Sequence, residues 1–364
     1  MNRPLPLWRW GGIASLVLIF VLIAALSGGA VATQLNSQSA ASRQQAQPAA
    51  DASTAGPGSA NGGAMPGDAR INTSAKPAAG WTARDPVLPP ADSPTVHNVS
   101  FEVIEKSVEV APGITQHMWT FNGTTPGPIL RGKLGDTFNI TITNHGFQPH
   151  SIDFHASMVS PTTQMRSIAV GKSLVYSFVA NHSGIFMYHC GVSPTLLHIG
   201  EGMYGAVVID PPGLAPVDHE YVLIQSELYL GRNGGIEDYN KMLAANWDGV
   251  VFNGYYNQYV YSPIKVGKNQ RIRVWVMNDG PSENSSWHVV GTIFDTAFKE
   301  GAYTLRPDAS AGGSQALDLM PAQGGFVEFT LPADGNYTFI THKFSNVVKG
   351  AAGIFQVGNA APGG

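Results

Sequence analysis

The region from about Val96 onwards consists of short runs rich in Val, Ile, Phe, Tyr and Thr, separated by Gly, Pro, Asn and Asp. The first runs are VHNVSFEVIEKSVEV, TQHMWTFNG, DTFNITITN, KSLVYSFVA, GIFMYHC and YGAVVID. After Pro211-Pro212-Gly213 come HEYVLIQSELYL, GVVFNGYYN, NQRIRVWVMN, SWHVVGTIFD, GFVEFTLP, NYTFITH and AAGIFQV. Strand-like runs recurring every ~10 residues are typical of β-sandwiches. The pattern predicts an all-β protein, in which only the stretch from Glu237 to Asn246 favours a helix.

The two halves of this region resemble each other in sequence. The triplet FNG at 121–123 recurs at 252–254, and KLG at 133–135 recurs as KVG at 265–267. The stretch from Phe178 to Gly184 matches the stretch from Phe329 to Gly335. Similarity of this kind indicates repeated structural units. We therefore expect two tandem Greek-key β-sandwich domains, at residues 93–213 and 214–358, followed by a flexible tail at 359–364.

The N-terminal part of the chain has a different composition. Arg3 and Arg9 precede an uncharged apolar run from Gly11 to Val31, which is typical of an export signal and approaches the ~20 residues of a membrane span. Residues 35–92 are rich in Ala, Ser, Gly and Pro, so they should form a disordered linker. We expect residues 1–34 to be a signal peptide or, in better agreement with a linker behind them, an uncleaved membrane anchor. The protein is then extracytoplasmic, either membrane-anchored or at the periplasm or cell surface.

Charge and cysteine content limit the classes of function. The 364 residues carry a net charge of −4 with 13% charged residues, which gives no basic patch for nucleic acid. Cys190 is the single cysteine, so an intrachain disulfide is excluded. A lone thiol in an exported protein needs an explanation. Ligation to a metal is sufficient, because a bound thiolate is protected from random oxidation.

The stretch GIFMYHCGVSPTLLHIGEGMYGAVVI, from Gly184 to Ile209, offers such ligation. It places Cys190, His198 and Met203 on one loop between apolar runs. A thiolate, an imidazole and a thioether form a soft ligand set, which suits copper in a trigonal site with a weak axial methionine. That geometry needs a second histidine, and the upstream segment HSIDFH at 150–155 offers one.

Strand geometry divides the nearby histidines between two sites, because side chains alternate faces along a strand. His150 and His155 are five residues apart, and His189 directly precedes Cys190. The economical assignment directs His150 inward with the ligands of the loop and leaves His155 and His189 together on the opposite face. Asp153 shares the face of His155. Two imidazoles form a partial site for a second metal, whose third ligand must come from outside this domain.

The second domain lacks the thiolate. Aligned without gaps, it has Thr341 where Cys190 stands and His342 one residue later, with no methionine in the matching place. His288, in SSWHVVGTIFD, falls where the first domain has its HSIDFH segment. We therefore expect one thiolate-copper site per chain, in the first domain, and regard His288 and His342 as metal-proximal candidates.

With these motifs in view, the chain resembles the copper-containing nitrite reductases, which are trimers of two cupredoxin domains. The resemblance covers about residues 95–358 and depends on HSIDFHA, YHC-x7-H-x4-M, SWHVVG and ITH. It implies two tandem cupredoxin-like sandwiches, one type 1 and one type 2 copper per subunit, and one-electron reduction of nitrite to nitric oxide and water. It also implies a homotrimer and an electron donor such as a c-type cytochrome or a small cupredoxin.

The family's functional residues are carried over by matching motif positions. The resemblance implies a type 1 copper bound by His150, Cys190, His198 and Met203. It implies a type 2 copper bound by His155, His189 and, from the neighbouring subunit, His342. It also implies proton handling by Asp153 and the neighbouring subunit's His288, in a pocket shaped by Val290. The short loop GVSPTLL between Cys190 and His198 resembles the compact-loop branch of the family. It departs from the longer loop of the better-known periplasmic enzymes.

Two other classes of protein are the alternatives. A tethered cupredoxin-type electron carrier would bind type 1 copper only and would leave Asp153, His155, His288 and His342 without a role. A two-domain multicopper oxidase would use many histidines, usually in H-x-H pairs and an H-C-H triplet. Here Gly191 follows Cys190 and no H-x-H occurs in the chain, so the sequence favours the nitrite reductase.

Overall fold

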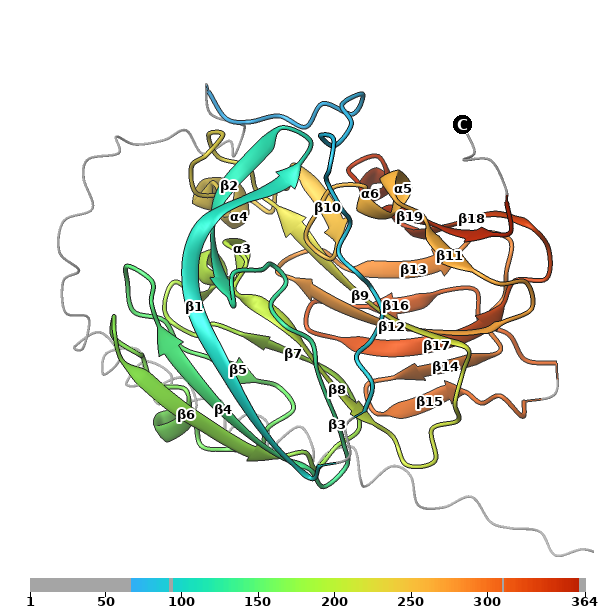
Figure 1. The fold of residues 1–364 in the computed structure, drawn as a ribbon, viewed down its shortest axis with the longest axis horizontal. Helices are drawn as coiled ribbons and strands as arrows, with labels where there is room; N and C mark the ends of the chain where they lie inside the picture. The colour runs from blue at the N-terminus through green and yellow to red at the C-terminus, as the bar shows by residue number, and fades with distance from the viewer. Residues whose placement is uncertain (1–66, 92–93, 310, 360–364) are drawn as a thin grey trace, which may run out of the picture. The chain divides into compact units, whose positions relative to one another are not determined.

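A computed structural model describes residues 67–91, 94–309 and 311–359 of the chain (Figure 1). The predicted signal peptide or anchor at 1–34 lies outside the described residues, as do residues 35–66 of the predicted linker and 360–364 of the predicted tail. No helix in the described part is long and apolar enough to cross a membrane. From Val96 onwards the described chain forms four sheets joined by loops and short helices, which confirms the predicted all-β class.

The first half of the described chain forms two four-stranded sheets, with the orders β2-β1-β4-β6 and β3-β8-β7-β5. Both sheets contribute to one hydrophobic core, for example through Ile140 of β4 and Tyr188 of β7. Every second residue of β4 is buried, as expected for a strand with one face in a core. The strands are β1 (Val96–Ala111), β2 (Ile114–Phe121), β3 (Leu130–Lys133), β4 (Thr137–Asn144), β5 (Asp153–Phe154), β6 (Ser173–Val179), β7 (Gly184–His189) and β8 (Tyr204–Asp210).

The second half forms a six-stranded sheet, β10-β9-β12-β17-β14-β15, and a five-stranded sheet, β11-β19-β18-β13-β16. A second hydrophobic core lies between them and includes Val274 of β12 and Phe339 of β18. The strands are β9 (His219–Leu228), β10 (Gly249–Phe252), β11 (Ile264–Val266), β12 (Arg271–Gly280), β13 (Ser285–Val289), β14 (Thr296–Lys299), β15 (Ala302–Leu305), β16 (Leu317–Leu319), β17 (Gly324–Thr330), β18 (Gly335–Thr341) and β19 (Ala352–Val357).

The strand pairing of the first half recurs in the second. Strands β1 and β4 pair in parallel, as do β9 and β12. The parallel pair β3–β8 corresponds to β11–β19, and the antiparallel pair β5–β7 corresponds to β13–β18. Strands β14, β15 and β16 have no counterpart among the described strands of the first half. The repeat seen in the sequence is therefore a repeat of topology.

The two FNG triplets form equivalent turns. Asn122 and Asn253 have positive φ values of 55° and 57°, and the glycine after each is also in the left-handed region. Asn and Gly adopt this conformation more readily than other residues, and Asn-Gly favours tight turns. Each Asn Oδ1 accepts a backbone hydrogen bond, from Glu102 N at 2.6 Å and from Ile224 N at 2.8 Å. The same motif thus fixes a turn to a neighbouring strand in both halves.

A hydrophobic layer joins the halves. It contains residues of β7 and β8 from the first half and of β9, β12, β14 and β17 from the second, including Met187, Val208, Ile224 and Trp275. These apolar side chains are shielded from water only while the halves are in contact, so their burial stabilises that contact.

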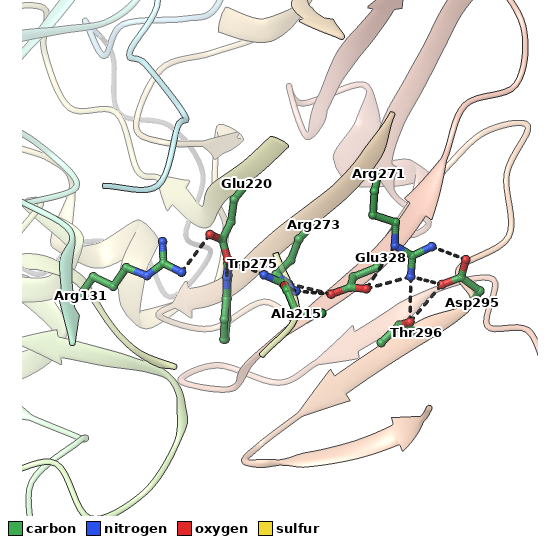
Figure 2. Close-up of polar contacts among 9 residues, drawn as sticks. All are labelled: Arg131, Ala215, Glu220, Arg271, Arg273, Trp275, Asp295, Thr296 and Glu328. Atoms are coloured by element: carbon green, nitrogen blue, oxygen red, sulfur yellow. Dashed lines mark hydrogen bonds and ion pairs between the residues drawn. The ribbon is translucent and has the colours of Figure 1, made fainter. Parts of the chain in front are cut away.

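A chain of ion pairs also runs from the first half into the second (Figure 2). Arg131 of β3 lies 2.9 Å from Glu220 of β9, which also pairs with Arg273 of β12 at 3.0 Å. Arg273 continues to Glu328 of β17 at 2.6 Å, and Glu328 to Arg271 at 2.8 Å. Burial by itself raises the pKa of Glu220, but its hydrogen bonds and the two arginine charges outweigh burial, so that the pKa is lowered. The folded protein therefore stabilises the ionised form of Glu220.

The described helices are short. They are α2 (Pro161–Gln164), α3 (Thr195–Gly200), α4 (Tyr239–Leu243), α5 (Gln258–Tyr261) and α6 (Phe344–Val347). Helix α4 lies within the stretch expected to be helical and begins after Asp238, whose side chain accepts hydrogen bonds from two backbone N–H groups of the first turn. The other four helices have at most six residues each, which is too short to produce a helical period in the sequence.

Residues 67–91 differ from the expectation of a disordered linker that extends to residue 92. Asp68 lies 3.3 Å from the ammonium group of Lys241, which is buried. Arg84 donates hydrogen bonds to two backbone carbonyls of the first half. Leu88 is buried in the layer between the halves. A few anchoring side chains are enough to fix this segment, although its average composition is that of a linker.

Candidate metal centres

Four residues predicted to bind one metal lie in the interior of the first half. Cys190 follows β7, His198 belongs to α3 and Met203 directly precedes β8, while His150 forms an isolated bridge with Ile168. Each of the four exposes at most 2% of its surface. Backbone hydrogen bonds of 3.1 Å run from Cys190 N to the Met203 carbonyl and from Met203 N to the His198 carbonyl. The loop that connects β7 and β8 is thereby closed around these side chains.

Three ligand atoms converge inside this loop. The Nδ1 atoms of His150 and His198 are 3.2 Å apart, and they lie 3.9 and 3.2 Å from the Sγ atom of Cys190. We call these three residues the cysteine cluster. The backbone N–H of Ser151 donates to the same sulfur at 3.3 Å. The Trp119 ring packs against both imidazoles, with centroids 4.8 Å from His198 and 5.7 Å from His150.

The protonation of the cysteine cluster follows from its burial. Burial and the neighbouring His150 lower the pKa of His198 to about 4. Burial also lowers the pKa of His150, against the effect of a hydrogen bond to Glu105. Both imidazoles are therefore neutral at pH 7, which is the form that binds metals. Burial raises the pKa of the Cys190 thiol, so binding of a metal must release its proton.

This donor set fits copper. Two imidazole nitrogens and a thiolate sulfur around one point match the trigonal ligands of a blue copper centre, and the neighbouring Met203 offers a weak fourth donor. The enclosed position also fits, because a buried centre with fixed ligands changes oxidation state with little rearrangement.

A second group of ligand residues lies nearer the surface. The Nε2 atoms of His155 and His189 are 3.0 Å apart, and Oδ2 of Asp153 lies 3.9 Å from the first and 4.0 Å from the second. Their side chains are partly exposed, at 32%, 14% and 26% for His155, His189 and Asp153. We call these three residues the exposed cluster. Burial and the neighbouring His189 lower the pKa of His155, so that its imidazole is neutral at pH 7.

The pairing of β5 with β7 orders the exposed cluster. Asp153 lies directly opposite His189, and His155 N donates to the Met187 carbonyl at 3.0 Å. His189 Nδ1 lies 2.9 Å from the Cys190 carbonyl. Because a carbonyl can only accept, Nδ1 carries the hydrogen and Nε2 presents its lone pair to the cluster. His189 and Cys190 point to opposite faces of the strand, as their adjacent positions predict.

His288 and His342 lie in the second half and line a cavity of about 630 Å³. Their ring centroids are 5.4 Å apart. His288 Nδ1 donates to the Gln315 carbonyl, and His342 N donates to the Ser286 carbonyl at 2.7 Å. Val290, the residue expected to shape the pocket, follows β13 and is 49% exposed. Within the described part of one chain, neither histidine joins the exposed cluster.

Several residues beside these sites carry no recognisable signal in the sequence. Glu105 contacts His150 from a strand 45 positions earlier, and the ring of Trp119 packs on two members of the cysteine cluster. Gln315 orients His288, and Lys343 lines the same cavity. None of these residues shares a motif with its partner, because only the folded chain brings them together.

Comparison with known proteins agrees with this geometry. The family model described as multicopper oxidase matches residues 102–213. The copper-containing nitrite reductase of Neisseria meningitidis serogroup A is 33% identical over 294 residues, which cover 77% of this chain and 75% of that protein. That of Alcaligenes xylosoxydans is 27% identical over 300 residues, covering 72% of this chain and 86% of that protein.

Solved structures give the same result. A copper nitrite reductase from Nitrosomonas europaea has a TM-score of 0.66 and 31% identity, over 73% of this chain and 96% of that chain. A multicopper oxidase follows with a TM-score of 0.63 and 28% identity, over 72% and 89%. The fold and the buried His-Cys-His cluster thus define a copper protein made of two cupredoxin-like sandwiches. Within that class, the chain belongs to the copper-containing nitrite reductases.

Proposed function

We propose that this protein reduces nitrite to nitric oxide, in the balanced step NO₂⁻ + 2H⁺ + e⁻ → NO + H₂O. Family membership supports this reaction, and one structural observation carries it. The cysteine cluster and the exposed cluster are joined through the consecutive residues His189 and Cys190, one in each cluster. A site for electrons and a site open to an anion are thereby connected by a single peptide unit.

Each cluster has its own ligands in this proposal. The type 1 copper is held by the cysteine cluster together with Met203, and the type 2 copper by His155, His189 and His342 of a neighbouring subunit. When bound, copper supplies one-electron transfer at the buried site and a Lewis-acidic position for an anion at the exposed site. The burial of the first set and the partial exposure of the second support this division.

Asp153 is the proposed proton donor. Its Oδ2 faces the Nε2 atoms of both His155 and His189 at about 4 Å, so it lies beside any anion held between these imidazoles. A carboxyl group at this position can deliver a proton to the oxygen that leaves nitrite as water. His288 of the neighbouring subunit is proposed to hold or relay the second proton, because its Nδ1 is fixed on Gln315 and its Nε2 remains for proton exchange.

The shared site requires an oligomer. The exposed cluster offers two imidazoles, and the cavity around His288 and His342 lies on the second half of the same chain. A cyclic trimer would bring the second half of one subunit onto the first half of the next. Sedimentation of the full chain tests this assembly, and a monomer that keeps full turnover would contradict it.

The direct test is copper content with electron paramagnetic resonance and nitrite turnover, for the full chain and for His342→Ala. We expect two coppers per chain in the wild type, and in the variant a lost type 2 signal, a retained blue signal and loss of turnover. His219→Ala is the matched control, because His219 is the remaining histidine of the second half and lies outside the cavity, where its ring contacts Gln270 at 2.6 Å and stacks on Tyr221. One blue copper in all three proteins would instead identify an electron carrier.

Oxygen reduction is the second candidate function, because the multicopper oxidase model matches residues 102–213 and a solved multicopper oxidase shares the fold. The absence of H-x-H pairs from the sequence opposes it. Oxygen uptake with a reduced dye as electron donor, measured beside nitrite consumption, separates the oxidase from the nitrite reductase. We expect nitrite consumption to dominate, and the reverse would favour the oxidase.

The proposal extends to the setting of the enzyme. The apolar segment at 11–31 and the two arginines that precede it support export, with residues 1–34 as a signal peptide or membrane tether. Electrons would come from a small donor such as a c-type cytochrome or a cupredoxin. Fractionation of cells that produce the full chain tests the location, and recovery in the cytosol would contradict it.

A further inference from the structure

Glu105 contacts the cysteine cluster from outside it. Its Oε1 lies 3.1 Å from Nε2 of His150, while Nδ1 of the same ring faces Cys190 and His198. The His150 side chain is fully buried and the Glu105 side chain is only 6% exposed. Each ring nitrogen of His150 is thus directed to a different partner.

The contact determines the tautomer of His150. A carboxylate accepts hydrogen bonds, so the hydrogen of the neutral imidazole must be on Nε2. Nδ1 then presents its lone pair to the other two members of the cluster. A carboxylate behind a ligating histidine also makes the imidazole more electron-rich, and such outer partners alter both affinity and redox behaviour of a metal site.

The carboxylate is held in place by its surroundings. Its Oε1 also accepts a hydrogen bond from Phe147 N at 2.8 Å. At Gly146, a Cβ atom would lie 2.6 Å from that oxygen and 3.2 Å from His150 Nε2, so the absence of a side chain there makes room for the contact. Across the β1–β2 ladder, Glu105 is paired with Trp119, whose ring packs on His150. These features of the local structure therefore agree on one position of the carboxylate.

We propose that Glu105 is a positioning residue of the type 1 copper centre, which fixes the His150 tautomer and lowers the reduction potential of the bound metal. The inference rests on the proposed function, since it takes the cysteine cluster to be the electron-accepting site. A buried negative charge stabilises the oxidised, more positive form of the metal relative to the reduced form. Loss of that charge should raise the potential.

The test is optical redox titration of the blue band in the full, copper-loaded protein, for the wild type and Glu105→Gln. The glutamine is nearly the same size and keeps a carbonyl acceptor, but it has no charge. In Glu105→Gln we expect the ratio of reduced to oxidised copper at a fixed applied potential to rise about tenfold. For a one-electron couple this corresponds to a rise of about 59 mV in the reduction potential. Competition with a copper chelator should show affinity weakened by about 10-fold or more.

Two further variants separate this role from a structural one. Glu109→Gln is the matched control, because Glu109 lies on the same strand and bonds to Tyr255 Oη and Gly113 N but to no member of the cluster. It should leave the potential unchanged. Glu105→Asp keeps the charge and should shift the ratio less than Glu105→Gln does, and it serves as the test variant if the glutamine protein does not fold.

The outcomes are distinguishable. A wild-type protein without a blue band would refute the assignment of the cysteine cluster and with it the proposed function. A blue wild type whose potential matches that of Glu105→Gln, or a Glu109→Gln variant that shifts as much, would overturn the role of Glu105 and leave the proposed function intact.

Discussion

The two halves of this protein place different residues on the same framework. In the first half Asp153 lies opposite His189, and in the second His288 lies opposite Ile340. By this register, Thr341 is the counterpart of Cys190. The two are even bonded alike, because the N–H of Ser151 donates to the Cys190 sulfur at 3.3 Å and that of Ser286 to the Thr341 hydroxyl at 2.9 Å.

The comparison separates what the fold contributes from what individual residues contribute. Both halves provide a buried acceptor at the end of a central strand and a backbone N–H aimed at it. Only the first half adds imidazoles at that point, since the register places Ser285 where His150 stands. A duplicated sandwich can therefore keep its internal hydrogen bonds while one copy holds a metal and the other offers His288 and His342 to a different surface.

The largest effect is expected when the first half is made like the second. Cys190→Thr should remove the blue band and lower nitrite turnover by more than about 100-fold, because a hydroxyl replaces the thiolate ligand. The fold should persist, since a threonine already occupies the equivalent buried position. Absorption spectra, circular dichroism and turnover check this. Thr341→Val, at the equivalent position of the second half, is the control and should keep the blue band. A blue Cys190→Thr protein would contradict the assignment of Cys190 as a copper ligand.

The next effect concerns the ion pairs that join the halves. Glu220→Gln removes one carboxylate partner from Arg131, which keeps Asp210, and one from Arg273, which keeps Glu328. The loss of these charge-assisted contacts should cost about 3 kcal/mol of unfolding free energy at pH 7. The pKa of Glu220 is lowered in the folded protein, so its contribution is complete above the ordinary glutamate value of 4.5 and is lost as the pH falls through the folded value. Denaturant unfolding at pH 7 and below pH 4 measures this. A difference that stays constant with pH would contradict it.

The smallest effects are expected for substitutions in the two Asn-Gly turns. Asn253→Ala should cost about 2 kcal/mol and Asn122→Ala about 1 kcal/mol, because both lose a residue suited to positive φ but only Asn253 is buried. The Asn253 amide also donates to the Val222 carbonyl at 3.0 Å and to Tyr259 Oη at 2.6 Å. Thermal unfolding of the two variants ranks their losses of stability. Equal losses would show that the burial of the turn at Asn253 adds no stability.

The sequence predicts the fold class and family because the informative residues are local. Alternating runs mark strands, and the FNG triplets mark repeated turns. Cys190, His198 and Met203 lie close together in the sequence, on one loop. The same parity argument correctly separates His189 from Cys190, which the structure places in different clusters. The assignment of individual residues to copper stays a prediction.

What the sequence does not predict depends on distant partners. The contact of Glu105 with His150 spans 45 positions and follows from the path of β1. Strands β14, β15 and β16 break the symmetry of the repeat, and no periodicity shows to which sheet they add. Helix α3, which carries His198, has six residues and no side-chain hydrogen bond at its N-cap, so no capping signal marks it in the sequence.

The segment at 67–91 has a consequence for how the protein is handled. Arg84 is bonded to the first half, and Leu88 is buried between the halves. Asp68 lies 3.3 Å from the buried ammonium group of Lys241, which also pairs with Asp248 at 3.0 Å. A protease that cuts between residues 91 and 96 would therefore leave a peptide that stays attached to the globular part. Shortened versions intended for crystals or for industrial use should begin before Asp68, since a later start would remove one of the carboxylates that lie against the buried Lys241.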